Sequence, residues 1–209
     1  MARLGDIAKI SAGQGAPQGD SNYCQEGIPF VKAANLIELL SGKPIDDIQR
    51  VSATVAKKYK LKLYSKGTVL FAKSGMSCLK GYVYALPTDA YVVNHLACIT
   101  PYMDISDFLV YYFTFHKPNQ LVKDSAYPSI SLSDIANMEI NLKSYEMRAN
   151  IVSILNKLTT LISLRKQQLA KLDELVKARF VEMFGESRLN PKSWNIVKLE
   201  QIADVGSSK

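Results

Sequence analysis

Residues 145–185 read YEMRANIVSILNKLTTLISLRKQQLAKLDELVKARFVEMFG, and neither proline nor glycine interrupts them before Gly185. Apolar side chains recur here in alternating steps of four and three residues, which is the spacing of a coiled-coil seam. The seam residues, which we expect to mediate dimerisation, are Ile151, Leu155, Leu158, Ile162, Leu169, Leu172, Val176 and Met183. At ~1.5 Å per residue such a helix would be roughly 60 Å long, so most of it must project from a globular domain of this size.

Two arginines, Arg165 and Arg179, occupy seam positions where the spacing calls for apolar side chains. Each needs an acidic partner, such as Asp173 or Glu174 across the seam, or a route to water. A second apolar line runs beside the seam and comprises Ile154, Leu161, Leu164, Leu175 and Phe180. This line makes the apolar face wider than one partner helix would bury, so we expect more than one neighbour.

The composition limits the class of protein. A length of 209 residues suits one ordinary domain with an appendage, and no apolar run reaches the ~18 residues of a membrane span. The first 20 residues lack the basic start and apolar core of a secretory signal, so we expect a cytoplasmic protein. Cys24, Cys78 and Cys98 form an odd, scattered set that does not indicate a disulfide framework. His95 and His116 are isolated, and we expect no metal site.

Catalytic motifs are missing from the sequence. We find no glycine-rich nucleotide loop, no paired-histidine motif, no nucleophile elbow and no Asn-Pro-Pro-aromatic segment of an amino-methyltransferase. The adjacent acids Asp46 and Asp47 could belong to a nuclease, but such pairs usually lie on a surface turn. We therefore expect a non-catalytic chain.

The first 144 residues alternate strand and helix signals and predict an α+β domain. Residues 4–11 indicate a short turn or helix that enters a strand, and the glycines of residues 13–19 indicate a loop. Apolar and β-branched runs predict strands at 28–31, 68–71, 81–85, 91–100 and 138–142. Helical spacing predicts helices at 52–59 and 104–115, and Ser52 is a suitable cap for the first.

Basic residues cluster in one segment of this domain. The net charge is +7, and between Arg50 and Lys80 the chain carries eight lysines and arginines, with no acid between Asp47 and Asp89. Lysines interleaved with tyrosines suit phosphate and groove contacts with nucleic acid, and serine, asparagine and glutamine side chains beside glycine loops can read base edges. A solvated surface and loop-stabilising hydrogen bonds explain the same residues equally well from the sequence alone. The candidate DNA-binding residues are Gln14, Gln18, Lys57, Lys58, Lys60, Lys62, Lys73, Ser74, Ser77, Lys80, Tyr82, Asn94, Tyr127 and Ser129.

A short repeat follows the helix. At an offset of 195 residues, Leu4 aligns with Leu199, Ile7 with Ile202, and Ile10 with Val205. A fixed-period repeat usually marks a repeated structural unit, and this one begins where a second unit would begin.

Several segments in this order resemble the specificity (S) subunit of type I restriction-modification systems, or one half of it. They comprise residues 4–8 (LGDIA), the loop 13–17, residues 28–31 (IPFV), residues 67–70 (GTVL), Gly81 and Tyr82, and residues 130–134 (ISLSD). Asn94 and His95 stand where the family usually has asparagine followed by glutamine. Residues 141–146 lack the prolines that normally precede the family's helix. The resemblance covers nearly the whole chain.

The resemblance implies a mixed α/β target recognition domain in residues 1–144, a conserved-region helix in 145–185 that spaces and dimerises, and the start of a second unit or a C-terminal tail in 186–209. It implies double-stranded DNA and two methyltransferase (M) subunits as partners, with or without a restriction (R) subunit. The cofactors S-adenosylmethionine and ATP/Mg would be bound by those partner subunits, not by this chain. The alternative is a coiled-coil adaptor whose globular head binds protein.

The chain resembles half of a two-unit subunit, so we expect it to restore the other half by pairing with a second copy. Antiparallel pairing of the helices would place two recognition domains at opposite ends and predict a palindromic, bipartite DNA target. If the chain is a piece of a longer one, the helix would instead pair with a second helix in the missing part, and the target would be asymmetric.

Overall fold

The computed structural model describes residues 1–186, 188–204 and 206. Contacts divide the chain into two compact units, Met1–Ser153 and Ile154–Lys209. The division falls within the first turns of the long helix rather than at residue 144, because Val152 still packs against the core of the first unit. The predicted class, an α+β domain followed by a long helix, is confirmed.

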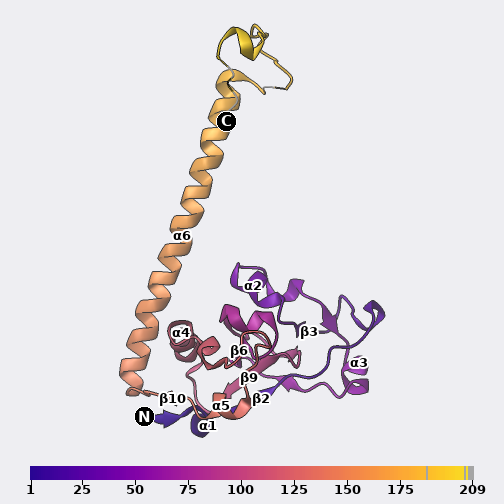
Figure 1. Ribbon diagram of the computed structural model, residues 1–209, viewed down its shortest axis with the longest axis vertical. Helices are drawn as coiled ribbons and strands as arrows, with labels where there is room; N and C mark the ends of the chain where they lie inside the picture. Colours follow the sequence, from indigo (N-terminus) through magenta and orange to yellow (C-terminus); the bar gives the residue numbers. More distant parts are fainter. Residues whose placement is uncertain (187, 205, 207–209) are drawn as a thin grey trace. The chain divides into compact units, whose positions relative to one another are not determined.

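The first unit contains two four-stranded sheets, labelled in part in Figure 1. One is antiparallel, with the strand order β2 (Ala8–Ala12), β9 (Leu96–Pro101), β6 (Val69–Ala72) and β7 (Val83–Ala85). The other has the order β4 (Arg50–Val51), β3 (Ile28–Val31), β8 (Ala90–Val92) and β5 (Leu63–Tyr64), with β3 and β8 parallel. A two-stranded pair joins β1 (Ala2–Arg3) to β10 (Glu139–Ile140).

Short helices cover these sheets and connect their strands. The α-helices of the first unit are α1 (Leu4–Ile7), α2 (Asn35–Leu40), α3 (Ala53–Lys58), α4 (Ser106–Phe115) and α5 (Leu132–Ala136). The 3₁₀ turns of the chain are η1 (Asp20–Asn22), η2 (Ile45–Asp47), η3 (Met76–Lys80), η4 (Pro118–Leu121) and η5 (Leu199–Gln201). Two serines start helices as caps, because the Ser52 side chain accepts from Val55 N and the Ser131 side chain from Asp134 N.

The core draws on both sheets, and α4 covers part of the antiparallel one. Strand β6 is buried along its whole length, as expected for a strand covered on both faces. Phe113 of α4 contacts Phe71 of β6 edge to face, with ring centroids 5.5 Å apart. Burial raises the pKa of the Cys98 thiol in the neighbouring strand to about 12. The first unit therefore has its own hydrophobic core.

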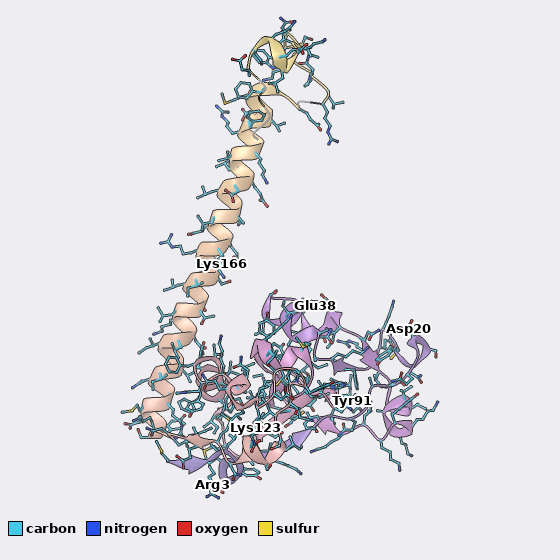
Figure 2. All side chains as sticks on the ribbon, viewed as in Figure 1. Arg3, Asp20, Glu38, Tyr91, Lys123 and Lys166 are labelled. Carbon is cyan, nitrogen blue, oxygen red and sulfur yellow. The ribbon has the colours of Figure 1, made fainter. Side chains whose placement is uncertain are left out.

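The second unit begins inside α6 (Tyr145–Phe184), which confirms the predicted long helix (Figure 1). Its apolar side chains are exposed over most of its length, and Figure 2 shows side chains such as that of Lys166 standing out from a single helix. The helix ends at Gly185, whose φ of 80° is the left-handed conformation of a helix C-cap. The side chains of Lys192 and Trp194 then donate to the last helical carbonyls, Lys192 to Glu182 O and Met183 O and Trp194 to Phe184 O. None of the described helices is long and apolar enough to cross a membrane.

The seam arginines find partners on their own helix. Arg179 forms a salt bridge with Glu182 at 2.7 Å, and Arg165 donates to the Gln168 side chain at 2.9 Å. Both arginines therefore avoid an unpaired position on the apolar face.

The C-terminal repeat carries a related local structure. Residues 199–201 form η5 at the positions that align with α1. Leu4 is fully buried, whereas its counterpart Leu199 is 62% exposed. Val205, which aligns with Ile10, lies outside the described residues, as do residues 187 and 207–209 of the predicted C-terminal segment.

Two elements differ from the predictions. The run 91–100 is not one strand, because residues 93–95 separate β8 from β9 and carry the chain from one sheet to the other. Helix α2, which starts at Asn35, is not among the predicted helices. The strands predicted at 28–31, 68–71, 81–85 and 138–142 are present with boundaries shifted by up to two residues.

Candidate DNA interface

Loops from both sheets meet at one edge of the first unit. In the antiparallel sheet, β2 ends at Ala12 opposite Ala97, and β6 ends at Ala72 opposite Leu96, where β9 begins. The loops after β2 and β6 and the turn before β9 therefore leave the sheet on the same side (Figure 1). We call this side of the first unit the loop edge, made of residues 13–19, 60–62, 73–75, 93–95 and 127–130.

The turn 93–95 is held by backbone hydrogen bonds on both sides. Gln14 N donates to Val92 O at 2.8 Å, and Asn94 N donates to Gln14 O at 2.9 Å. On the other side, Lys73 N donates to His95 O at 2.9 Å. Both Asn94 and His95 are exposed. The sheet crossover therefore presents two polar side chains from a tightly bonded turn.

The loops 73–75 and 127–130 are bonded to each other. Gly75 N donates to Pro128 O at 2.9 Å, and Ile130 N donates to Lys73 O at 2.8 Å. These bonds enclose an isolated antiparallel bridge between Ser74 and Ser129. The loop edge is therefore built from segments far apart in sequence that share main-chain bonds.

The lysine segment adjoins the same edge. Strand β5 pairs antiparallel with β8, so residues 60–62 come to lie beside the end of β8. Lys62 N donates to the Gln14 side-chain oxygen at 2.9 Å. Lys57, Lys58 and Lys60 are exposed on and just after α3. Lys66 belongs to the opposite edge, where its N–H donates to the carboxylate of Asp89 at 2.9 Å.

The structure brings together a subset of the predicted site residues. Through hydrogen bonds or shared loops, the loop edge contains Gln14, Gln18, Lys60, Lys62, Lys73, Ser74, Asn94, Tyr127 and Ser129. Ser77 and Lys80 belong to η3, which starts directly after Gly75, and Tyr82 directly precedes β7. These three continue the edge along the chain.

Two predicted base-reading glutamines are engaged within the protein. The Gln14 side-chain oxygen accepts from Lys62 N, and the Gln18 side-chain amide donates to Ala16 O at 3.0 Å. In this arrangement both side chains stabilise their loop. By contrast, Tyr127 is 83% exposed on the loop that is bonded to residues 73–75. Its ring is available for contact with a ligand.

Sequence reasoning did not include His95 among the site residues. The Ser74 hydroxyl lies 2.9 Å from His95 Nδ1, so the ring belongs to the loop edge. Its position next to Asn94 in the sequence was the available signal.

The chemistry of the loop edge is basic and polar. Lysines supply positive charge, and the serine, asparagine and tyrosine side chains supply both donors and acceptors. In the described part of the chain, no group of three or more His, Cys, Asp or Glu side chains is placed to hold a metal ion.

The chain is a loop-bearing α+β domain followed by a long helix whose apolar side chains are exposed. The family model described as "Type I restriction modification DNA specificity domain" matches residues 1–174. The chain belongs to this family. It is 30% identical over 194 residues to the type I restriction enzyme MjaIX specificity subunit of Methanocaldococcus jannaschii. The match covers 90% of this chain and 44% of that protein, so the chain spans less than half of its curated relative.

Solved structures show the same fold. The HsdS subunit from Thermoanaerobacter tengcongensis matches with a TM-score of 0.60 and 24% identity, over 88% of this chain and 44% of that one. A chain from a structure on the assembly and conformational transition of the type I R-M system matches with a TM-score of 0.63 and 23% identity, over 85% of this chain and 42% of that one. This likeness concerns the fold.

Proposed function

We propose that this chain is a DNA sequence-recognition subunit of a type I restriction-modification complex and that its first unit binds one half of a bipartite target. The observation that carries the proposal is the loop edge, where loops from both sheets are bonded together beside an acid-free lysine segment. Membership of the specificity-domain family supports the same function.

Two kinds of contact with DNA are involved, one with the phosphates and one with the bases. The exposed lysines on and after α3 neutralise phosphates, which supplies affinity without sequence choice. The exposed side chains of Asn94 and Ser129 are of the types that read base edges in the major groove. They lie on loops pinned by main-chain bonds, and a base contact requires positions held to within about half an ångström.

The chain itself is not catalytic in this proposal. Two methyltransferase subunits, with or without a restriction subunit, dock on it and carry S-adenosylmethionine and ATP/Mg. These subunits can bind the second apolar line of α6. A single partner helix on the seam would not cover this line, so residues such as Leu161 and Leu164 would stay exposed.

The seam itself joins two copies in antiparallel orientation. In a parallel, in-register pair, Arg165 and Arg179 would each face the same arginine of the other copy, and the like charges would repel each other. An antiparallel pair that overlaps over residues 151–183 is centred on Gln167. There Arg165 faces Leu169, and Arg179 faces Leu155. Antiparallel pairing therefore keeps the arginines of the two copies apart, and every seam residue from 151 to 183 still faces a seam residue of the other copy.

This pairing predicts a target with two equal halves. The helix spans roughly 60 Å, somewhat under two turns of B-DNA at about 34 Å each. Two short half-sites related by a two-fold axis, with an unread gap, fit that spacing. Sequencing of methylated sites in cells that express this chain with its methyltransferase tests the idea. An asymmetric motif with two unlike halves from this chain alone would exclude it.

Salt-dependent DNA binding tests the lysine contacts. Charge reversal at Lys57, Lys58 and Lys60 should weaken binding to all DNA sequences and reduce the slope of log K against log [salt] by about 0.9 for each phosphate that is no longer neutralised. Lys66→Glu is the matched control for each single reversal, because it changes an exposed lysine at the opposite edge.

The triple reversal leaves the base preference intact in this proposal. If the slope is unchanged, or if Lys66→Glu alters it equally, the α3 lysines do not contact phosphates. If the chain shows no salt-dependent affinity for double-stranded DNA, the protein-binding adaptor is the better interpretation.

A further inference from the structure

His95 occupies the centre of the loop edge. It ends the turn that carries the chain from β8 in one sheet to β9 in the other. Its carbonyl accepts from Lys73 N, and the preceding Asn94 N–H donates to Gln14 O. The loops 13–19 and 73–75 thereby fix the backbone from which the exposed imidazole projects, so the position of the ring follows from the fold rather than from a flexible loop.

A second contact fixes the direction of the ring. The Ser74 hydroxyl lies 2.9 Å from His95 Nδ1, and the backbone of Ser74 is itself bridged to Ser129. Nε2 has no hydrogen-bond partner in the described part of the chain. The serine therefore binds one ring nitrogen and directs the other outwards, since the partner of one imidazole nitrogen sets the tautomer of the other.

The surroundings indicate what this nitrogen would meet. Lys73 precedes Ser74, and Lys62 lies beside Gln14 on the same edge. These cations draw the acceptor-rich surface of DNA towards the turn. When the Ser74 hydroxyl donates to Nδ1, Nε2 carries the proton and is a hydrogen-bond donor. In the major groove, guanine presents two adjacent acceptors, N7 and O6, to such a donor.

We propose that His95 is a specificity-determining residue that donates from Nε2 to the major-groove edge of a guanine, and that Ser74 is its positioning residue. This inference rests on the proposed function of the loop edge in DNA recognition. It assigns one base contact to one side chain.

The test uses the full chain and a pool of random double-stranded DNA, from which bound sequences are selected. The wild-type chain should select a guanine at one position, and His95→Ala should lose about tenfold in preference at that position alone. Ser74→Ala should weaken the same preference, whereas Ser74→Thr, which keeps a hydroxyl, should retain it. The salt slope and the thermal midpoint should not change, since the backbone bonds of both residues remain.

An atomic substitution in the DNA identifies the contact. Replacing the selected guanine by 7-deazaguanine removes N7, and replacing its base pair by 2-aminopurine paired with thymine removes O6. The replacement that removes the acceptor of His95 should weaken wild-type binding by about the factor that His95→Ala costs. The same replacement should have little further effect on the His95→Ala chain, because the contact is already absent.

The outcomes separate this inference from the proposed function. If no variant or wild-type chain binds DNA, the proposed function fails and the base contact fails with it. If DNA binds and His95→Ala weakens all sequences equally with a lower salt slope, His95 contacts phosphate and the inference is wrong. Selection that His95→Ala leaves unchanged also overturns it.

Discussion

Gly13 is the point where the loop after β2 passes closest to the sheet crossover. A Cβ atom at this position would lie 2.1 Å from Val92 O and 2.3 Å from Val93 O. Real Cβ atoms essentially never come within 3.0 Å of another heavy atom, and both neighbours here are backbone. The substitution Gly13→Ala must therefore move the loop away from the turn 93–95.

The cost follows from the bonds that such a movement breaks. Three bonds depend on the close approach: Gly13 N to Leu96 O, Gln14 N to Val92 O, and Asn94 N to Gln14 O. Each contributes about 1 kcal/mol, and residual overpacking adds about 1–3 kcal/mol. We expect Gly13→Ala to lower the free energy of unfolding of the first unit by roughly 4–6 kcal/mol, a large part of the total for a domain of this size.

Pulse alkylation of Cys98 in increasing urea measures this change. Cys98 is fully buried in β9, so its alkylation reports the unfolding of the first unit and not that of α6. Gly15→Ala is the matched control: nothing lies within 4 Å of its Cβ position, and the change should stay within about 0.5 kcal/mol. If the urea midpoint of Gly13→Ala falls no further than that of Gly15→Ala, the close approach does not hold the loop edge together.

Three further outcomes follow from the structure. The exposed Cys24 should react with iodoacetamide in the native protein at pH 8, while Cys98 should react only on unfolding; equal labelling rates would contradict the buried position of Cys98. Because burial raises the Cys98 pKa from 9.0 to about 12, its contribution to stability is complete below pH 9 and is lost as the pH rises towards 12, so Cys98→Ala should flatten the fall in stability above pH 9. The double variant Leu158→Asp and Leu172→Asp should raise the dimer dissociation constant more than about a hundredfold, because each leucine buried in the dimer contributes about 1.5–3 kcal/mol. Thr160→Asp, on the far side of α6, should leave the dissociation constant unchanged. Sedimentation equilibrium measures both variants, and a wild-type chain that is monomeric at tens of micromolar would rule out the pairing.

Local sequence patterns were sufficient to predict the long helix and one buried strand. The helix predicted for 145–185 is α6 (Tyr145–Phe184), because continuous spacing without proline or glycine, and a glycine at the end, specify a helix from neighbouring residues alone. The buried strand β6 was predicted for a similar reason, since its apolar run is short and follows a turn at Gly67 with a φ of 83°.

The crossover at 93–95 could not be predicted in this way. It has neither glycine nor proline, and apart from the local bond from Leu96 N to Val93 O it is held by bonds to Gln14 and Lys73, far away in the sequence. For the same reason, the need for a glycine at position 13 is not visible in the sequence, because it arises from the carbonyl groups of Val92 and Val93. Long-range main-chain bonds override local strand propensity at this place.

The features of the candidate site also differ in whether the sequence alone determined them. Composition and spacing by themselves determined the basic segment and the apolar seam, because charge density and periodicity are properties of neighbouring residues. The family resemblance came from short segments that follow one another in the family's order. Only the tertiary structure decided which polar side chains share an edge: it engaged Gln14 with Lys62 N, placed Lys66 at the opposite edge and set His95 against Ser74. These outcomes depend on strand order and register, which join segments that no local pattern relates.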